Sequence, residues 1–352
     1  MDYQKLLEQI LEEATSQGAS DVNFSPNHYP TIRVDTRLVP LSKFNVLDPE
    51  TSQGLVFAIL GEEKKNRFLA ERDLDFSYLY KDNRFRVNAY QTKGFFAAAL
   101  RFIPERIPTI EELNLPEIVK VFSRVSQGFV LVVGPNGHGK STTLASMIDL
   151  INHERAEKVI TIEDPIEYVF TPDKCVIDQR EVYSDTLSFH KALRSTFREN
   201  VDVIMVGEMR DYETMSVAVS AAETGHLVFA SLHTNNAIQT IDRIVNSFPS
   251  NQQPQIRDQL AATITGVISQ RLLPRINGGL IPATEVLIAN SAVRNLIREG
   301  RSSQLNNVIE TSFNQGMISM ERSLASLVNK KEISMDQAEF YAMDTGRLKE
   351  LL

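Results

Sequence analysis

Hydrophobic residues follow different patterns in the two parts of the chain, and the first part predicts a small mixed domain. From Tyr3 to Gly18 the apolar residues fall at helical spacing and a glycine ends the run, which predicts an amphipathic helix. Asp48-Pro49 predicts the start of a second helix, with Gly61 at its end. Strands are predicted at Thr31–Val34, Leu74–Tyr80, Arg84–Gln91 and Phe95–Ile103, with Lys81, Asp82 and Asn83 as a hairpin loop between the second and the third. Helices combined with antiparallel strands indicate an α+β domain.

The second part of the chain has longer apolar runs without alternation. It follows a stretch rich in proline (Pro104, Pro108 and Pro116), which predicts a linker. Apolar runs at Phe129–Val133, Val159–Ile162, Val201–Val206 and Leu227–Ala230 are separated by helical stretches. This pattern predicts a parallel sheet covered by helices on both faces, and from about Ile281 we expect mostly helix. We therefore predict a domain at 1–103, a linker at 104–117 and an α/β domain at 118–352.

The composition is that of a soluble globular protein and excludes several classes of site. No apolar run approaches the ~20 residues that cross a bilayer, and the acidic, amphipathic start lacks the features of a signal peptide. We therefore expect the protein to stay in the compartment where it is made. The single cysteine, Cys175, excludes an intrachain disulfide and a four-cysteine zinc site. The net charge of −8 argues against a nucleic-acid partner.

One segment matches a motif with a known mechanism. Gly134–Ser141 fits the phosphate-binding P-loop pattern and stands between the predicted strand Phe129–Val133 and a predicted helix, Thr142–Ile151. Its glycines let backbone N–H groups turn toward phosphates, and the helix N-terminus favours an anion. We expect Lys140 to reach the β- and γ-phosphates of ATP and Ser141 to bind Mg²⁺. The predicted nucleotide-binding residues of this loop are Gly134, Pro135, Asn136, Gly137, His138, Gly139, Lys140, Ser141 and Thr142.

Two other predicted strands end in acidic residues. Val159–Ile162 leads to Glu163, Asp164 and Glu167, and Val201–Val206 leads to Glu208. In parallel α/β sheets the ligand lies beyond the carboxyl ends of the strands, so both acidic groups can face the P-loop. Phosphoryl transfer to water needs one carboxylate for the Mg²⁺ shell and another to orient the water. Glu167 and Glu208 are therefore candidate catalytic residues, and Glu208 is also a candidate metal ligand with Ser141. Glu163 and Asp164 are candidate nucleotide-binding residues, and the residue that acts as the base stays open.

Three histidines lie near these motifs. At the end of the strand Leu227–Ala230, His233 is expected to contact or sense the γ-phosphate. For His226, at the start of the same strand, a structural role and a nucleotide-binding role both stay open. Two imidazoles at opposite ends of a strand are weak evidence for a metal site. For His138, inside the P-loop, we favour a side chain that faces solvent over one that contacts a phosphate.

Longer blocks of sequence resemble the secretion-ATPase superfamily, and most closely the retraction ATPases of type IV pili, the PilT and PilU group. The blocks are ITIEDPIEYVF, VDVIMVGEMRDYET, AAETGHLVFASLHTNN and AVRNLIREGR, together with GASDVNFS and RFRVNAY nearer the start. The resemblance implies a PAS-like N-terminal domain, a RecA-like ATPase domain and a homo-hexameric ring. Asn136 and His138 depart from the family's usual small loop residues, which puts the catalytic rate in doubt.

The resemblance also implies roles for individual residues. They are the Walker A loop for Gly134–Ser141, the Asp box for Glu163, Asp164 and Glu167, the Walker B acid for Glu208, and the His box for His226 and His233. Glu167 falls at the proposed position of the catalytic base. Arg86 and Arg101 fall at positions that place arginines against the nucleotide of a neighbouring subunit, where a guanidinium stabilises transition-state charge.

The predicted function is hydrolysis of Mg-ATP to drive pilus retraction, that is, pilin disassembly and twitching motility. We expect a cytoplasmic protein at the inner face of the cytoplasmic membrane, with a pilus platform protein and a paralogous retraction ATPase as partners. The helix Ala292–Arg301 is predicted to carry Arg294, Arg298 and Arg301 on one basic face, a pattern that by itself indicates a solvated surface. The resemblance implies that this segment couples hydrolysis to retraction. Alternatives are a pilus-assembly or type II secretion ATPase, a RecA-like nucleic-acid translocase and a non-hydrolysing binding module. A PilT-type and a PilU-type role both stay open.

Overall fold

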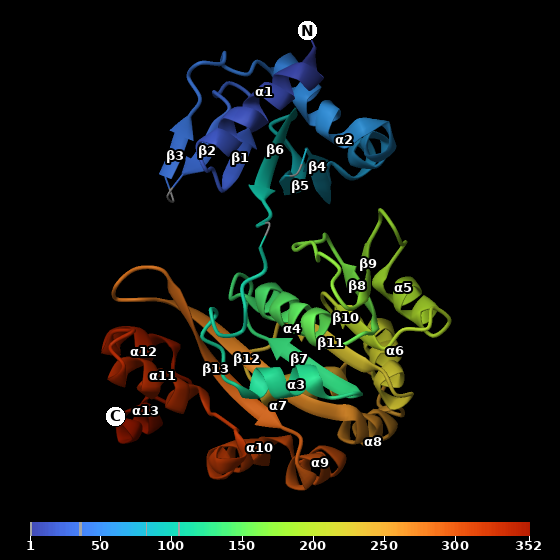
Figure 1. The fold of residues 1–352 in the computed structure, drawn as a ribbon, viewed down its shortest axis with the longest axis vertical. Coiled ribbons are helices and arrows are strands. Elements are labelled where there is room, and N and C mark those ends of the chain that lie inside the picture. The colour runs from blue at the N-terminus through green and yellow to red at the C-terminus, as the bar shows by residue number, and fades with distance from the viewer. Residues whose placement is uncertain (1, 35–36, 82, 105) are drawn as a thin grey trace. The chain divides into compact units, whose positions relative to one another are not determined.

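The computed structural model describes residues 2–34, 37–81, 83–104 and 106–352. Contacts divide the chain into two compact units, one of residues 1–106 with 164–169 and one of residues 107–163 with 170–352 (Figure 1). Most of the predicted linker therefore packs with the second unit, while the segment Asp164–Val169 packs with the first. Asp82 of the predicted hairpin loop and Glu105 of the predicted linker lie outside the described residues.

The described residues of the first unit form an antiparallel sheet and two helices. Its sheet has the strand order β3-β2-β1-β6-β5-β4. The elements are α1 (Tyr3–Ser16), β1 (Asp21–Phe24), β2 (Thr31–Val34), β3 (Arg37–Pro40), α2 (Pro49–Glu71), β4 (Asp73–Tyr80), β5 (Asn83–Thr92) and β6 (Phe95–Phe102). Asp2 caps α1 by accepting from the backbone N–H of Lys5, and the predicted apolar stripe of the helix is buried. The predicted α+β character of this unit is confirmed.

The helix α2 contains the predicted break at Gly61 and a second helical stretch after it that was not predicted. Asp48 caps its start as expected, since its carboxylate accepts from the backbone N–H of Thr51. Gly61 adopts a positive φ of 63° and kinks the helix, but helical structure resumes and continues to Glu71. Gly61 therefore ends the first helical stretch as predicted, because a residue with positive φ interrupts a helix. Here Phe68, in the continued segment, is fully buried, and its packing favours a second helical stretch after the break.

The second unit is a seven-stranded sheet with helices on both faces. Its strand order is β13-β12-β7-β11-β10-β8-β9, and all neighbouring pairs are parallel except β12 with β13. The strands are β7 (Gly128–Val133), β8 (Lys158–Glu163), β9 (Val176–Glu181), β10 (Val203–Val206), β11 (Leu227–Leu232), β12 (Ile264–Pro274) and β13 (Leu280–Ile288). The helices are α3 (Ile118–Arg124), α4 (Lys140–Glu154), α5 (Phe189–Thr196), α6 (Tyr212–Glu223), α7 (Ala237–Asn246), α8 (Gln253–Thr263), α9 (Ser291–Arg298), α10 (Leu305–Thr311), α11 (Met320–Asn329), α12 (Met335–Tyr341) and α13 (Thr345–Leu351), with short 3-10 turns η1 (Ser302–Gln304) and η2 (Phe313–Gln315).

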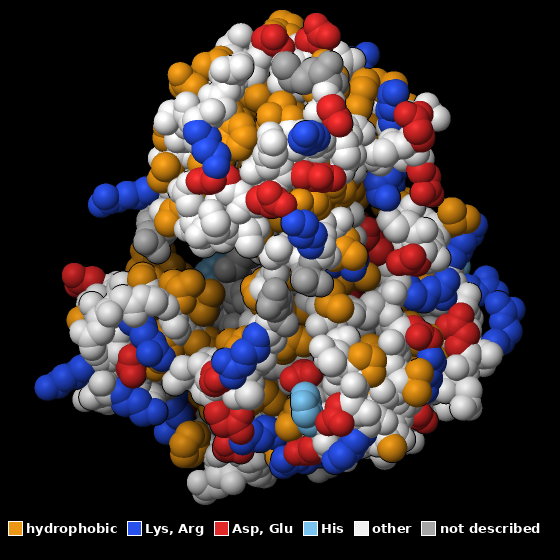
Figure 2. All heavy atoms as spheres, turned by 45° about the horizontal axis from the view of Figure 1, so that its top comes forward, with side chains coloured by type: hydrophobic (Ala, Val, Ile, Leu, Met, Phe, Trp, Pro, Cys, Tyr) orange, Lys and Arg blue, Asp and Glu red, His pale blue; other side chains and the backbone are white. Residues whose placement is uncertain are grey.

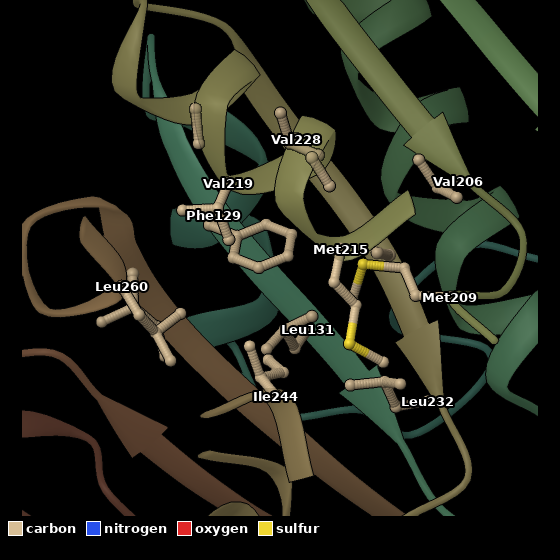
Figure 3. Close-up of a cluster of buried hydrophobic side chains, with 14 of the residues drawn as sticks. Phe129, Leu131, Val206, Met209, Met215, Val219, Val228, Leu232, Ile244 and Leu260 are labelled. Carbon is tan, nitrogen blue, oxygen red and sulfur yellow. The ribbon is translucent and has the colours of Figure 1, made fainter. Parts of the chain in front are cut away.

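The core of this unit explains why its strands are continuous apolar runs. Every residue of β7 is buried, because the strand lies inside the sheet and is covered on both sides. Phe129 and Leu131 point into the same cluster as Val219 of α6, Ile244 of α7 and Leu260 of α8 (Figure 3). No described helix is long and apolar enough to cross a membrane.

The hairpin of β12 and β13 was not predicted. We expected strands to become rare from about Ile281, yet β12 and β13 pair along nine registered positions from Gly266–Ile288 to Pro274–Leu280. Polar residues interrupt the apolar run of β12, so the segment lacks the continuous apolar pattern of a buried strand. Helices α11 to α13 pack against the far end of the hairpin, as their shared core with Leu273, Ile281 and Ala283 shows. The hairpin matters for function because β12 lies directly beside β7, the strand that leads into the P-loop.

Candidate nucleotide-binding site

The P-loop lies where the sequence pattern predicts it. It connects β7 to α4, whose first residue is Lys140. Gly137 and Gly139 have φ values of 75° and 80°, which turn the backbone into a conformation that favours glycine. A Cβ on Gly139 would lie 2.9 Å from Nε2 of Gln270, so the end of that side chain would have to shift. The loop and the N-terminus of the long helix α4 together form a concave set of N–H groups suited to phosphate.

Lys140 is held inside this loop. Its Nζ donates to the carbonyl oxygens of Gly134 at 3.0 Å and of Pro135 at 2.9 Å, and only 8% of the residue is exposed. The same Nζ lies 3.3 Å from Nδ1 of His233. The ammonium is therefore placed at the mouth of the loop, where phosphate oxygens can replace the carbonyl oxygens as acceptors.

His233 and Glu208 continue the row that starts at Lys140. His233 follows β11 and Glu208 follows β10, and these two strands are neighbours in the sheet. Nε2 of His233 lies 2.9 Å from Oε1 of Glu208, and the other carboxylate oxygen, Oε2, accepts from Nε of Arg210 at 3.0 Å. The carboxyl ends of three parallel strands thus bring the predicted Lys140, His233 and Glu208 together. The contact with Arg210 was not predicted.

Ser141 fits the expected role of a metal ligand. It is half-buried in the first turn of α4, next to Lys140, and its hydroxyl makes no hydrogen bond with any residue that the structure describes. A P-loop site supplies Mg²⁺ with one hydroxyl, while phosphate oxygens and waters complete the shell. Glu208 adds a carboxylate at the end of the nearby β10, so the donors are all oxygens of the kind that Mg²⁺ prefers. Thr142 is half-buried beside Ser141, and Asn136 is exposed at the tip of the loop.

Glu163 is buried at the end of β8. Its Oε1 accepts from the hydroxyl of Thr161 at 2.6 Å and from the side-chain amide of Gln179 at 3.3 Å. Asp164, the next residue, belongs to the segment that packs with the first unit. The expected nucleotide contacts of these two residues stay predictions.

Glu167 contacts an arginine of the first unit. Both residues belong to the first unit, and Oε1 of Glu167 lies 3.0 Å from Nη1 of Arg86. Arg101 stands opposite Arg86 in the register of β5 and β6, and its Nε donates to Oδ1 of Asp21 at 2.9 Å. Arg101 remains largely exposed, with 73% of its side chain accessible. The structure therefore brings Glu167 and Arg86 together, and the expected catalytic roles of Glu167, Arg86 and Arg101 stay predictions.

The two remaining histidines have structural contacts. His226 lies at the start of β11, where its carbonyl accepts from the N–H of Gly128 at the start of β7. Its Nδ1 lies 3.0 Å from the carbonyl oxygen of Ala221. The P-loop begins at the other end of β7, a strand length away (~20 Å). Within one chain, this geometry supports the structural role that was left open for His226.

His138 does not face solvent as expected. Its Nδ1 accepts from the backbone N–H of Leu272 at 2.8 Å, and its ring stands edge-on to Tyr341 at 6.4 Å between centroids. Burial, Arg271 and Lys140 lower the pKa of the imidazole, which favours the neutral form that can accept this bond. The side chain therefore ties the P-loop to β12, and the favoured solvent-facing position was wrong because a strand that was not predicted lies beside the loop.

The predicted basic face of α9 is also corrected. Nη1 of Arg294 donates to the carbonyl oxygens of Ala261 and Ala262 at 2.7 Å each, and its Nε donates to that of Ala289 at 3.1 Å. These bonds satisfy carbonyl groups in the last turn of α8, so Arg294 has a structural role. Arg298 and Arg301 remain exposed, as expected.

Comparison with known proteins shows the family to which most of the chain is similar. Residues 98–334 match the sequence model of the family described as Type II/IV secretion system protein. The chain is 43% identical over 333 residues to the type IV pilus retraction ATPase PilT of Pseudomonas aeruginosa, covering 94% of this chain and 96% of that protein. This chain is also 37% identical over 351 residues to the type IV pilus ATPase PilU of the same bacterium, and the match covers 99% of this chain and 91% of PilU.

The solved structures agree with these relatives. The crystal structure of the pilus retraction motor PilT with bound ADP matches with a TM-score of 0.90 and 44% identity, covering 97% of this chain and 98% of that one. The predicted resemblance and the predicted α/β fold class are both confirmed. From its sequence match and its fold, this chain belongs to the Type II/IV secretion system protein family.

Proposed function

We propose that this protein is an ATPase motor that retracts type IV pili. One observation of geometry carries the enzymatic part: Lys140, His233 and Glu208 form a continuous row at the carboxyl edge of the sheet, beside a P-loop. The end-to-end similarity to a retraction ATPase supports the choice of retraction over assembly. The assembly ATPase PilB of Thermus thermophilus, in contrast, aligns over only 31% of its own length.

The residues of the row divide the chemistry between them. When ATP binds, its phosphates replace the carbonyl oxygens of Gly134 and Pro135 as partners of the Lys140 ammonium, which then neutralises charge on the β- and γ-phosphates. His233 lies 3.3 Å from the same ammonium. From there its imidazole contacts the γ-phosphate, so that His233 distinguishes bound ATP from bound ADP. Glu208, bonded to His233, orients the attacking water or binds the metal shell. Ser141 would hold Mg²⁺ together with the phosphates, and the ion would supply further charge neutralisation.

The motor works as a homo-hexamer with shared active sites. Arg86 and Arg101 lie next to each other on β5 and β6 of the first unit. We infer that both arginines act on the nucleotide of a neighbouring subunit. In that position their guanidinium groups stabilise the charge that develops in phosphoryl transfer. Glu167, which contacts Arg86, remains a second candidate for the base.

The motor takes its substrate from the cytoplasm, where ATP is available, and acts on the pilus through a platform protein in the inner membrane. A paralogous retraction ATPase is a further partner, since PilT and PilU occur together in Pseudomonas aeruginosa and both resemble this chain. Among the described residues, basic and acidic side chains are interspersed on the face that Figure 2 shows. This mixed charge suits a protein partner better than a nucleic-acid backbone.

Deletion of the gene, with a count of surface pili, tests the proposal. Excess pili on cells that no longer twitch would support retraction. Cells without pili would indicate an assembly ATPase, and unchanged pili and twitching would exclude both roles.

A further inference from the structure

Strand β12 carries three consecutive polar residues that are all buried. Ser269 is 0% exposed, Gln270 is 3% exposed and Arg271 is 8% exposed, and apolar Val267 and Ile268 precede them on the same strand. Apolar residues would fill these positions at a lower desolvation cost, as they do elsewhere in the sheet. The stability of the sheet therefore does not explain the polar side chains, and their contacts point to the nucleotide site.

Gln270 holds the P-loop. Its Nε2 donates to the carbonyl oxygen of His138 at 2.9 Å, and its Oε1 accepts from the hydroxyl of Thr143 at 2.8 Å. One side chain thus contacts both the loop and the first turn of α4. Leu272, two residues further on, donates its N–H to His138 at 2.8 Å.

Ser269 and Arg271 hold a different loop. Successive side chains of a strand point to opposite faces, so these two lie on the face opposite to Gln270. The hydroxyl of Ser269 donates to the carbonyl oxygen of Asn235 at 2.8 Å. Nη2 of Arg271 donates to the same oxygen at 3.0 Å and to Oδ1 of Asn235 at 3.1 Å. Asn235 is two residues beyond His233.

We propose that Ser269 and Arg271 are positioning residues for hydrolysis, which fix His233 at its distance from Lys140. Both loops are bonded to one rigid strand, the P-loop through Gln270 and the loop of His233 through Asn235. The spacing of 3.3 Å between Lys140 and His233 therefore depends on β12 in addition to the direct pairing of β7 with β11. A shift of the His233 loop by about 1 Å would spoil contacts with the transferring phosphate while leaving the P-loop in place. This inference rests on the proposed role of His233 in hydrolysis.

The fork of Arg271 makes a conservative test possible. In the wild type, Nη1 of Arg271 donates to the carbonyl oxygen of Gln270 at 3.1 Å while Nη2 donates to Asn235. Arg271→Lys keeps a positive charge beside Glu285, but a single ammonium cannot donate to both acceptors in this geometry. In the purified full-length protein we expect kcat to fall about tenfold, with the Kd for a fluorescent ADP analogue changed less than about twofold. Ser269→Ala, which removes one hydroxyl and adds no bulk, should lower kcat in the same way by a smaller factor. Arg275→Lys is the matched control, since Arg275 pairs with Glu332 beyond the end of β12, and its kcat should equal that of the wild type.

A double-mutant cycle separates positioning from general damage. If Arg271 acts through His233, Arg271→Lys should lower kcat about tenfold in the wild type and less than about twofold in a His233→Ala protein. Equal factors in the two backgrounds, or wild-type kcat for both Arg271→Lys and Ser269→Ala, would overturn the inference while His233 keeps its role. A His233→Ala protein with wild-type kcat would overturn the role of His233 and the inference with it.

Discussion

Nζ of Lys140 lies 3.3 Å from Nδ1 of His233, and this contact fixes the tautomer of the imidazole. An ammonium can only donate, so Nδ1 must accept and Nε2 must carry the proton. That proton is directed at Oε1 of Glu208, 2.9 Å away. The strand-end residues therefore form a polarised chain from lysine to carboxylate, in which each group has a defined donor or acceptor role.

The first prediction concerns the lysine at the start of this chain. Lys140→Ala removes the phosphate cation, and we expect hydrolysis to be lost and ATP binding to be weakened. Phosphate release and binding of a fluorescent nucleotide measure the two effects separately. Turnover within about twofold of wild type would show that the P-loop is not the reaction site.

The second prediction concerns the carboxylates. Glu208→Gln removes a charge from the reaction site but leaves the P-loop and Lys140 intact, so we expect nucleotide binding to survive. Turnover should fall about 10²- to 10³-fold, because a carboxylate that orients the water or binds the metal stabilises mainly the transition state. Glu167→Gln should behave in the same way if Glu167 is the base. Wild-type turnover in both variants would mean that neither strand end takes part.

The third prediction tests active sites shared between subunits. A mixture of Arg101→Ala subunits and Lys140→Ala subunits should regain part of the ATPase activity, because some interfaces then contain an intact P-loop and an intact arginine. Arg101 is suited to this test because most of its side chain is exposed. Among the described residues its ion-pair partner is Asp21 alone. Rings shown to be mixed that stay inactive at every ratio would argue against sharing.

The fourth prediction concerns pH and a buried acid near the His233 loop. Glu285 accepts from the backbone N–H of Ala237 at 2.8 Å, and burial, the largest cause, raises the pKa of its carboxyl to about 7 from 4.5, with Glu321 and Glu310 adding to the rise and Arg271 opposing it. Because the folded pKa is the higher one, the folded state binds the proton more tightly. The stability from this group is complete below pH 4.5 and is lost as the pH rises through 7.

Glu285→Gln keeps the acceptor for Ala237 and removes the titration. We expect the fall in unfolding free energy between pH 5 and pH 8 to shrink by ~2 kcal/mol in this variant. Denaturant unfolding at the two pH values measures the change. An identical pH dependence in the variant and the wild type would show that Glu285 does not titrate in this range.

The fifth prediction concerns α9. Arg294→Ala leaves three carbonyl oxygens without their donor, so the free energy of unfolding should fall by about 2 kcal/mol. Arg298→Ala is the matched control on the same helix, and because Arg298 is exposed its effect should stay below about 0.5 kcal/mol. Equal effects of the two variants would contradict the structural role of Arg294. Coupling to retraction is therefore better tested by charge reversal at Arg298 and Arg301.

The sequence predicted features that depend on neighbouring residues, and it failed for features that depend on contacts between residues far apart in the chain. The P-loop and the ends of β8, β10 and β11 depend on local motifs, and Lys140, His233 and Glu208 meet because parallel strands end at one edge. The roles of His138 and Arg294 depend on distant partners, Leu272 and the last turn of α8, which no local pattern reveals. The apolar residues of β12 were the available local signal for a strand, and the buried polar residues Gln270 and Arg271 interrupt that signal.

Live imaging of labelled pili tests the central claim most directly. In cells whose only copy of the gene carries Glu208→Gln, the account predicts that pili extend and do not shorten, while the wild-type gene restores shortening and twitching. Pili that shorten at the wild-type rate in the Glu208→Gln cells, or that are never assembled in them, would contradict an ATP-driven retraction motor.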